Sequence, residues 1–351
     1  MFSRNFTGKT AAIALAAATV FSSFSHAQAQ EAETLTMAVY GGTFEEGWKK
    51  AIIEPFQAAN PNIKIQTTQG LTFQNLATMR AQKDNVKVDV LLMDEVAANQ
   101  ALAEGLVEPL DVSQIPNLAD LYPTFRVKDD PFAKFMFASA VVAYDSNTLK
   151  EPPASYKDFW KPEFKGKIAV NNLDSTVGLI FFVTINEIYG GTLDNVEPGF
   201  EAMKKLKPSI VTFPTQHAQL AQLLTNGDVV MAPWVSDRVI SQQKAGSSLR
   251  LAIPSDGGIV NEAVIVVAKG TKHKDAAFKY INYVLSPEGQ AANAKYTFIS
   301  PVNSKAVLDE ETAKIVPNGP EVMKTVRRPD WQKINANSPK WLERWNREIT
   351  Q

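Results

Sequence analysis

Residues 35–44 read LTMAVYGGTF. The apolar run Leu35–Tyr40 predicts a buried strand, and Gly41 and Gly42 then turn the chain into a helix. Thr43 is a good helix cap, and Glu46 three residues later completes the pattern of a capping box. A strand, a tight turn and a helix in this order predict an α/β fold, in which such turns lie at the carboxyl edge of a sheet.

The same alternation continues along the chain. Strands are predicted at 35–40, 63–67 and 88–93, with helices at 43–60, 75–82 and 96–104. A second series has strands at 139–144, 167–170, 210–213, 228–232, 249–253 and 262–268, with helices at 176–189, 197–206, 217–225, from about 234, at 275–285 and at 287–294. Each series predicts a mostly parallel sheet flanked by helices. We therefore expect two lobes with a ligand cleft between them.

The first residues have the pattern of a signal peptide. Arg4 and Lys9 give a basic start, residues 11–21 are uncharged and mostly apolar, and residues 27–29 read AQA, a small-residue cleavage pattern. We expect residues 1–29 to be removed on export. This removes two positive charges and no negative ones, so the formal charge changes from −1 to −3. An exported chain without cysteine fits the bacterial periplasm.

Composition disfavours several classes of function. The chain has no cysteine, which excludes cysteine nucleophiles, disulfides and cysteine-ligated metal clusters. Its net charge gives no support for a nucleic-acid partner. We interpret His217 and His273 as packing or surface residues. The sequence also lacks the nucleophile-elbow, phosphate-loop and zinc-protease motifs. We therefore expect no enzymatic activity, no metal and no cofactor.

Polar and aromatic residues follow two of the predicted strands. The loop of Gly41, Gly42 and Thr43 offers free backbone N–H groups to an anion, and Phe44 can form a wall of the site. Asp94 follows the third strand, where it either binds an ammonium group or caps the next helix. Each loop also has a purely structural interpretation. The first is a tight turn before a capped helix, and the second is a helix cap formed by Asp94.

Another candidate stretch reads PWVSDR, from 233 to 238. Trp234 at a strand end is placed to stack on a ligand or to contact a cation, and Asp237 and Arg238 supply both signs of charge. The alternative is a core tryptophan followed by two solvated charges at a helix start.

The stretch 159–167, FWKPEFKGK, looks like the W-K-P-E-[YF]-K-G signature of the bacterial periplasmic spermidine/putrescine-binding proteins of ABC transporters. Residues 256–259, 276–288 and 301–303 extend the resemblance over nearly the whole exported chain. It implies a two-lobe, type II-like receptor that closes on a small molecule and hands it to a membrane permease, as a monomer and without nucleic acid. Lobe one would comprise 31–137 and 262–302, and lobe two 138–261 and 303–351, with hinges near 137–140, 255–261 and 300–303.

The resemblance also implies site residues. Phe44 matches a cleft tyrosine of the family, Trp234 matches a cage tryptophan, and Gln332 matches a ligand-binding glutamine. Asp94 lies in a loop that touches the ligand in the family. Two family carboxylates are replaced by Leu173 and Thr176, with Asp174 close by.

The remaining family positions depart further. Asn261 and Ala263 stand where the family has a tryptophan and an aspartate, with Glu262 between them. The loss of acids, together with Arg238, favours a zwitterion such as an ω-amino acid or an aminophosphonate. A polyamine stays open if Asp174 or Glu262 replaces the missing acids.

The sequence bears on three other classes of protein. A sensor or partner-binding subunit stays open. Iron receptors of this fold need an adjacent tyrosine pair, which the chain lacks. A periplasmic enzyme is disfavoured because porphobilinogen deaminase, which has a similar two-lobe fold, needs a cysteine for its cofactor.

Overall fold

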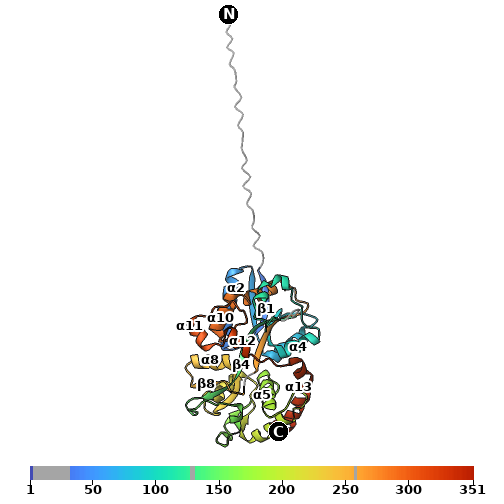
Figure 1. The fold of residues 1–351 in the computed structure, drawn as a ribbon. Helices are drawn as coiled ribbons and strands as arrows, with labels where there is room; N and C mark the ends of the chain where they lie inside the picture. The colour runs from blue at the N-terminus through green and yellow to red at the C-terminus, as the bar shows by residue number, and fades with distance from the viewer. Residues whose placement is uncertain (3–31, 127–130, 257–258) are drawn as a thin grey trace. The chain divides into compact units, whose positions relative to one another are not determined.

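The computed structural model of the protein describes residues 1–2, 32–126, 131–256 and 259–351. Apart from Met1 and Phe2, the predicted signal peptide lies outside the described residues, as do Gly257 and Gly258 from the family-like stretch. Residues 32–351 form one compact unit, in which helices flank a central sheet (Figure 1).

The sheet has nine strands in the order β2-β1-β3-β9-β4-β7-β5-β6, and β8 pairs with β4 beside this path. The strands are β1 Glu33–Val39, β2 Ile63–Gln69, β3 Val90–Asp94, β4 Ala133–Asp145, β5 Ile168–Ala169, β6 Ile210–Thr212, β7 Met231–Val235, β8 Leu249–Ala252 and β9 Val260–Val267. The expected α/β class is confirmed.

The sheet is mixed rather than mostly parallel. β1 runs parallel to β2 and β3, and β5 runs parallel to β6 and β7. β9 is antiparallel to β3 and β4, and β4 is antiparallel to β7 and β8. The antiparallel pairs all involve β4 or β9, the strands that lie at the middle of the sheet.

β4 joins the two halves of the sheet. Its first part, Ala133–Ser139, pairs with β9, and the rest, Ala140–Asp145, pairs with β7 or β8. The sequence predicted only 139–144 as strand. Lys134 interrupts the apolar pattern before it, yet Lys134 is buried and lies 3.5 Å from a Glu95 carboxylate oxygen. The charge pair therefore explains why the strand begins earlier than predicted.

The helices are α1 Thr43–Trp48, α2 Glu54–Ala59, α3 Thr72–Gln82, α4 Glu95–Ala103, α5 Thr176–Ile188, α6 Glu197–Leu206, α7 His217–Thr225, α8 Ser236–Lys244, α9 Lys274–Val284, α10 Pro287–Thr297, α11 Glu310–Ile315, α12 Gly319–Thr325 and α13 Trp331–Trp345. A π-helical segment, Lys49–Ile53, connects α1 with α2, so the predicted helix 43–60 is present with an irregular middle.

The predicted capping box at the start of α1 is wrong. Gly42 occupies the cap position with φ of 70°, and no side chain caps the helix. Thr43 is already the first helical residue, and its hydroxyl oxygen accepts a hydrogen bond from Ser241 on α8 at 3.1 Å. The left-handed conformation at Gly42 favours glycine and makes the sharp turn possible.

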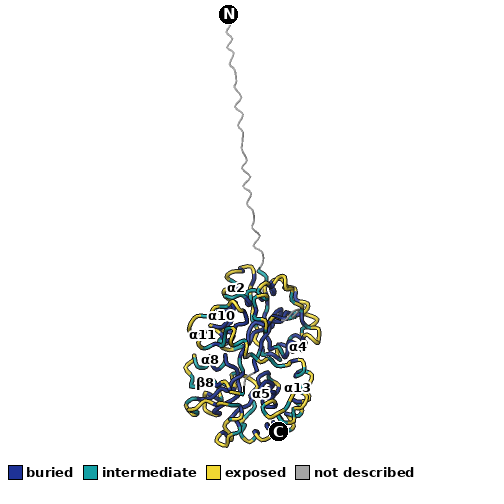
Figure 2. Tube along the Cα trace, viewed as in Figure 1, coloured by how far each residue is buried: buried dark blue, intermediate teal, exposed yellow. Residues whose placement is uncertain are grey.

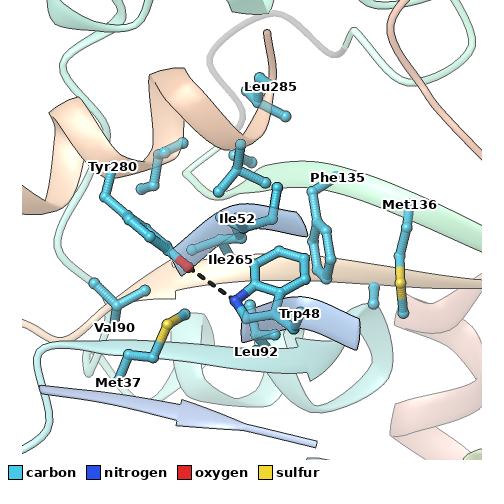
Figure 3. Packing of buried hydrophobic residues seen from close by; sticks show 14 of the residues in the cluster. Met37, Trp48, Ile52, Val90, Leu92, Phe135, Met136, Ile265, Tyr280 and Leu285 are labelled. Carbon is cyan, nitrogen blue, oxygen red and sulfur yellow. Dashed lines mark hydrogen bonds between the residues drawn. The ribbon is translucent and has the colours of Figure 1, made fainter. Parts of the chain in front are cut away.

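Buried apolar side chains form four clusters that cover both faces of each half of the sheet. Figure 2 marks the buried residues in dark blue along the chain. In the first half, Met37 and Leu92 belong to one cluster, while Ala38 and Leu91 belong to another. This separation follows from the alternation of side chains along a strand. Figure 3 shows the first cluster, where the Trp48 indole N–H donates to the Tyr280 hydroxyl at 2.8 Å.

Strand pairing and core packing can be compared with the lobe boundaries expected from the sequence. β4 passes from β9 to β7 at Ser139 and Ala140, close to the expected boundary at 137/138. The segment 303–326, however, supplies Val322 and Val326 to the core of the first half, whereas α13 packs in the second half. We therefore propose that the chain passes from lobe one to lobe two for the last time between α12 and α13, rather than at residue 303. The other boundaries stay predictions.

Candidate functional site

Two adjoining pockets lie where the two halves of the sheet meet. The first has a volume of about 310 Å³ and the second about 530 Å³. The first is lined by Tyr40, Phe44, Leu71, Thr72, Phe73, Gln74, Asp94, Met136, Ala138, Asn171, Asp174, Ser175, Thr176, Val177, Thr215, Gln216, His217, Val235, Asp237, Arg238 and Asn261. Leu71, Gln74, Gln216, His217 and Arg238 line both pockets. We therefore treat the pair as one site.

Asp94 stands at the carboxyl end of β3. It occupies the cap position of α4, but its side chain makes no capping bond and faces the first pocket instead. Its carboxylate accepts hydrogen bonds from Tyr40 Oη at 3.0 Å, Asn261 Nδ2 at 3.3 Å and Thr176 Oγ1 at 2.5 Å. Burial raises the pKa of Asp94, and these donors oppose the rise. Since Thr176 is on α5, Asp94 connects the two halves.

Asp237 and Arg238 lie in the first turn of α8, which begins at Ser236 directly after β7. Burial raises the pKa of Asp237, while the neighbouring Arg238 lowers it in part. Arg238 Nε lies 3.4 Å from Asp237 Oδ2, and Asp237 Oδ1 has no hydrogen-bond partner. None of the described residues accepts a hydrogen bond from the terminal Nη atoms of Arg238. One carboxylate oxygen and the end of the guanidinium are thus left for another molecule.

Phe44 forms an aromatic wall beside this pair. The Arg238 guanidinium carbon lies 5.5 Å from the centre of the Phe44 ring, which is a cation–π distance. Phe44 stacks on Trp48 with centroids 5.6 Å apart, and Tyr40 meets its edge at 5.3 Å. Trp48 is itself fixed by its hydrogen bond to the Tyr280 hydroxyl (Figure 3), so it holds the Phe44 ring in place.

His217 is the first residue of α7 and lines both pockets. Its Nδ1 accepts a hydrogen bond from Trp234 Nε1 at 2.9 Å. Burial and, to a smaller extent, the charge of Arg238 lower the pKa of His217 to about 3, so the ring is neutral at physiological pH. The interpretation of His217 as a packing or surface residue is incomplete, because the ring lies at the site.

The structure places Trp234 differently from the prediction. It lies inside β7 rather than after its end, is 1% exposed, and lines the second pocket. The predicted strand ended at Ala232, one residue before Pro233, and proline is unfavourable in a central strand. Pairing with both β4 and β5 keeps β7 intact.

Of the remaining predicted site residues, Gly41, Gly42 and Thr43 line the second pocket. Asp174 is exposed and lines the first, and Asn261 joins the first through its bond to Asp94. Sequence analysis did not select Tyr40, Thr72 or Thr176 for the site. The carboxyl-edge rule could have found Tyr40, which ends the first predicted strand.

Glu262 and Gln332 line neither pocket. Glu262 is fully buried, and its carboxyl Oε1 lies 2.5 Å from Nε of Arg328. Burial and the adjacent Glu95 raise the pKa of Glu262 to about 8. Gln332 is exposed on α13. We leave both out of the proposed site, because Glu262 contacts Arg328 and neither residue lines a pocket.

Comparison with known proteins identifies the family. Residues 51–323 match the family model of bacterial extracellular solute-binding proteins. The chain belongs to this family. The solute-binding protein is thus a receptor rather than an enzyme, located in the periplasm. Among the described residues, no helix has both the length and the apolar character that a membrane span requires.

Individual relatives agree with this assignment. The chain is 28% identical over 319 residues to a gamma-aminobutyric acid-binding protein of Pseudomonas aeruginosa, covering 88% of each chain. It is 24% identical over 285 residues to a spermidine/putrescine-binding periplasmic protein of Salmonella typhimurium, covering 78% and 79%. A crystal structure of an ABC transporter protein from Clostridium perfringens matches with a TM-score of 0.72 and 28% identity, covering 90% of this chain and 99% of the other.

Proposed function

We propose that this solute-binding protein binds a small zwitterion, with an ammonium group at one end and an anionic group at the other, and delivers it to an ABC-transporter permease. An ω-amino acid such as γ-aminobutyrate has this chemistry. The observation that carries the proposal is that one pocket contains both Arg238 and the buried aspartates Asp94 and Asp237.

The ammonium group would bind near Asp237. Its Oδ1 is a buried acceptor without a partner, and so are the side-chain oxygens of Asn171 and Asn261, which line the same pocket. Leaving buried acceptors unpaired costs about 1–3 kcal/mol each, so a ligand that donates several hydrogen bonds is favoured. The raised pKa of Asp237 supports this, because an ammonium charge offsets the burial of the carboxylate.

The anionic group would bind Arg238. The planar guanidinium pairs well with a carboxylate through two parallel hydrogen bonds, and its terminal nitrogens have no partner among the described residues. Phe44 holds the guanidinium from one side. The relative from Pseudomonas aeruginosa, named for γ-aminobutyric acid, supports a zwitterion.

A polyamine is the second candidate. Asp94, Asp174 and Asp237 outnumber the single cation Arg238 around the first pocket, and a di- or triamine would balance them. The Salmonella relative is named for spermidine and putrescine. Asp94 already accepts three side-chain hydrogen bonds from the protein, so we place this candidate behind the zwitterion.

Calorimetric titration with γ-aminobutyrate, putrescine and spermidine separates the candidates. We expect binding of γ-aminobutyrate, lost in Arg238→Gln and unchanged in the control Arg80→Gln, whose arginine pairs with Glu104 on the surface. Tight putrescine binding without any zwitterion binding would contradict the proposal. A monomer, also proposed, would be checked by light scattering on the same sample.

A further inference from the structure

We propose that His217 is a second anion-binding residue, fixed by Trp234 so that its Nε2–H donates a hydrogen bond to the carboxylate of the ligand beside Arg238. This assignment rests on the proposed function, since it concerns the anionic end of the same ligand. It also narrows the ligand class from zwitterions in general to amino carboxylates.

The hydrogen bond from Trp234 determines the tautomer of His217. An indole N–H is only a donor, so the nitrogen it contacts at 2.9 Å, Nδ1 of His217, must be an acceptor. A neutral imidazole has one protonated nitrogen, which is then Nε2. Trp234 is buried inside β7 and cannot turn away to solvent, so the arrangement is fixed before any ligand arrives.

The proton on Nε2 is available to a ligand. His217 lines both pockets, as Arg238 does, and none of the described residues pairs with Nε2. The ring stays neutral because burial and the nearby guanidinium disfavour a second proton. Arg238 and His217 therefore offer hydrogen-bond donors to one group. Of these two side chains, only Arg238 carries a positive charge.

This charge pattern favours a carboxylate over a phosphonate. One cation and one neutral donor match one negative charge. A second negative charge would lie near the buried carboxylates Asp94 and Asp237, which line the same pocket and repel it. Trp234 acts here as a positioning residue for His217, which differs from the ligand-stacking role expected from the sequence.

The first test compares variants by calorimetry with γ-aminobutyrate, using the exported protein recovered from the periplasm. His217→Leu should lower the affinity by about 10- to 100-fold, as expected for a hydrogen bond to a charged group. His217→Gln keeps an N–H donor and should recover most of the affinity. The control His273→Gln changes a half-buried residue that pairs with Glu33 and lines neither pocket, and it should bind normally. If His217→Leu bound γ-aminobutyrate within twofold of the wild-type affinity, the proposal would be overturned.

The second test uses ¹⁵N NMR of the imidazole rings. We expect His217 to show a protonated Nε2 and an unprotonated Nδ1 with and without ligand, and Trp234→Phe to give a mixture of tautomers and several-fold weaker γ-aminobutyrate binding. An Nδ1–H tautomer in wild type would refute the fixed ring. Tighter binding of 3-aminopropylphosphonate than of γ-aminobutyrate would refute the carboxylate assignment. If no zwitterion binds, the proposed function fails, whereas the tautomer still tests the Trp234–His217 contact.

Discussion

Glu262 should make the stability of the protein fall as the pH rises towards 8. Its carboxyl group is fully buried on β9 between Arg328 and Glu95, and burial followed by the Glu95 charge raises its pKa to about 8 from the ordinary 4.5. Burial raises the pKa of Glu95, but a hydrogen bond from Glu262 and the positive charges of Lys134 and Arg328 outweigh it. The net effect is a lowered pKa. The folded protein therefore keeps a proton on Glu262 that the unfolded chain has already released.

The sign follows from this difference in bound protons. A group whose pKa is raised by folding contributes most to stability below its unfolded pKa, and that contribution is lost as the pH rises through the folded pKa. Each pKa unit corresponds to about 1.4 kcal/mol, so Glu262 accounts for a loss of about 3 kcal/mol between pH 5.5 and pH 8. Glu262→Gln stays neutral over this range and should remove the loss.

The assay is urea unfolding of the wild type and Glu262→Gln at pH 5.5 and pH 8. We expect the free energy of unfolding to decrease with pH about 3 kcal/mol more in the wild type than in the variant. Asp94 and Asp237, whose pKa values are also raised, are present in both proteins and cancel in the comparison. The surface variant Glu104→Gln should keep the wild-type slope. Equal slopes for wild type and Glu262→Gln would refute the reasoning.

Three further changes test the packing around the site. Thr176→Val removes the 2.5 Å hydrogen bond to Asp94 and should lower the free energy of unfolding by about 1.5–3 kcal/mol in thermal or urea unfolding. Tyr280→Phe leaves the fully buried Trp48 N–H without an acceptor and should cost about 1–3 kcal/mol, measured in the same way. Gly178→Ala places a Cβ 2.0 Å from a loop carbonyl oxygen, so we expect a loss of about 1–3 kcal/mol or more and weaker γ-aminobutyrate binding by calorimetry.

Controls for the first two changes lie close by. Thr184→Val, also on α5, removes a bond to the backbone oxygen of Ile180 rather than to a carboxylate, and should cost less than Thr176→Val. Tyr296 is 44% exposed, so Tyr296→Phe should change stability by no more than about 0.5 kcal/mol. Losses as large in these controls as in the site variants would contradict the roles given to Asp94 and Trp48.

The sequence predicted the elements that local pattern determines. The apolar run before Asp94 and the Gly-Gly turn before Phe44 locate a strand end and a helix start without knowledge of the fold. It missed the first part of β4, where Lys134 interrupts an apolar run, and it ended β7 at Ala232. In both cases the deciding interaction comes from a distant part of the chain, a buried charge pair for Lys134 and pairing on both sides for β7.

The sequence predicted the site, like the fold, only in part. Asp94, Asp237 and Arg238 were found because charged residues after buried strands are conspicuous in the sequence. His217 looks ordinary there, although its partner Trp234 follows it by only 17 residues in the same half of the sheet. Thr176 matches a family carboxylate position, but only the approach of the two halves of the sheet makes Asp94 its partner. His217 does follow a parallel strand, β6, so the carboxyl-edge rule would have selected it if applied to every strand.

The position of β9 has a consequence for export. β3 is covered on one side by β1, but its other partner is β9, and 167 residues separate Asp94 from Asn261. The sheet of the first half therefore lacks a central strand until most of the polypeptide has been made. Contacts between distant residues form slowly. Such a chain stays unfolded during synthesis for longer than one built from local pairings, and an unfolded chain is the form that can be threaded across a membrane before the receptor assembles around its ligand pocket.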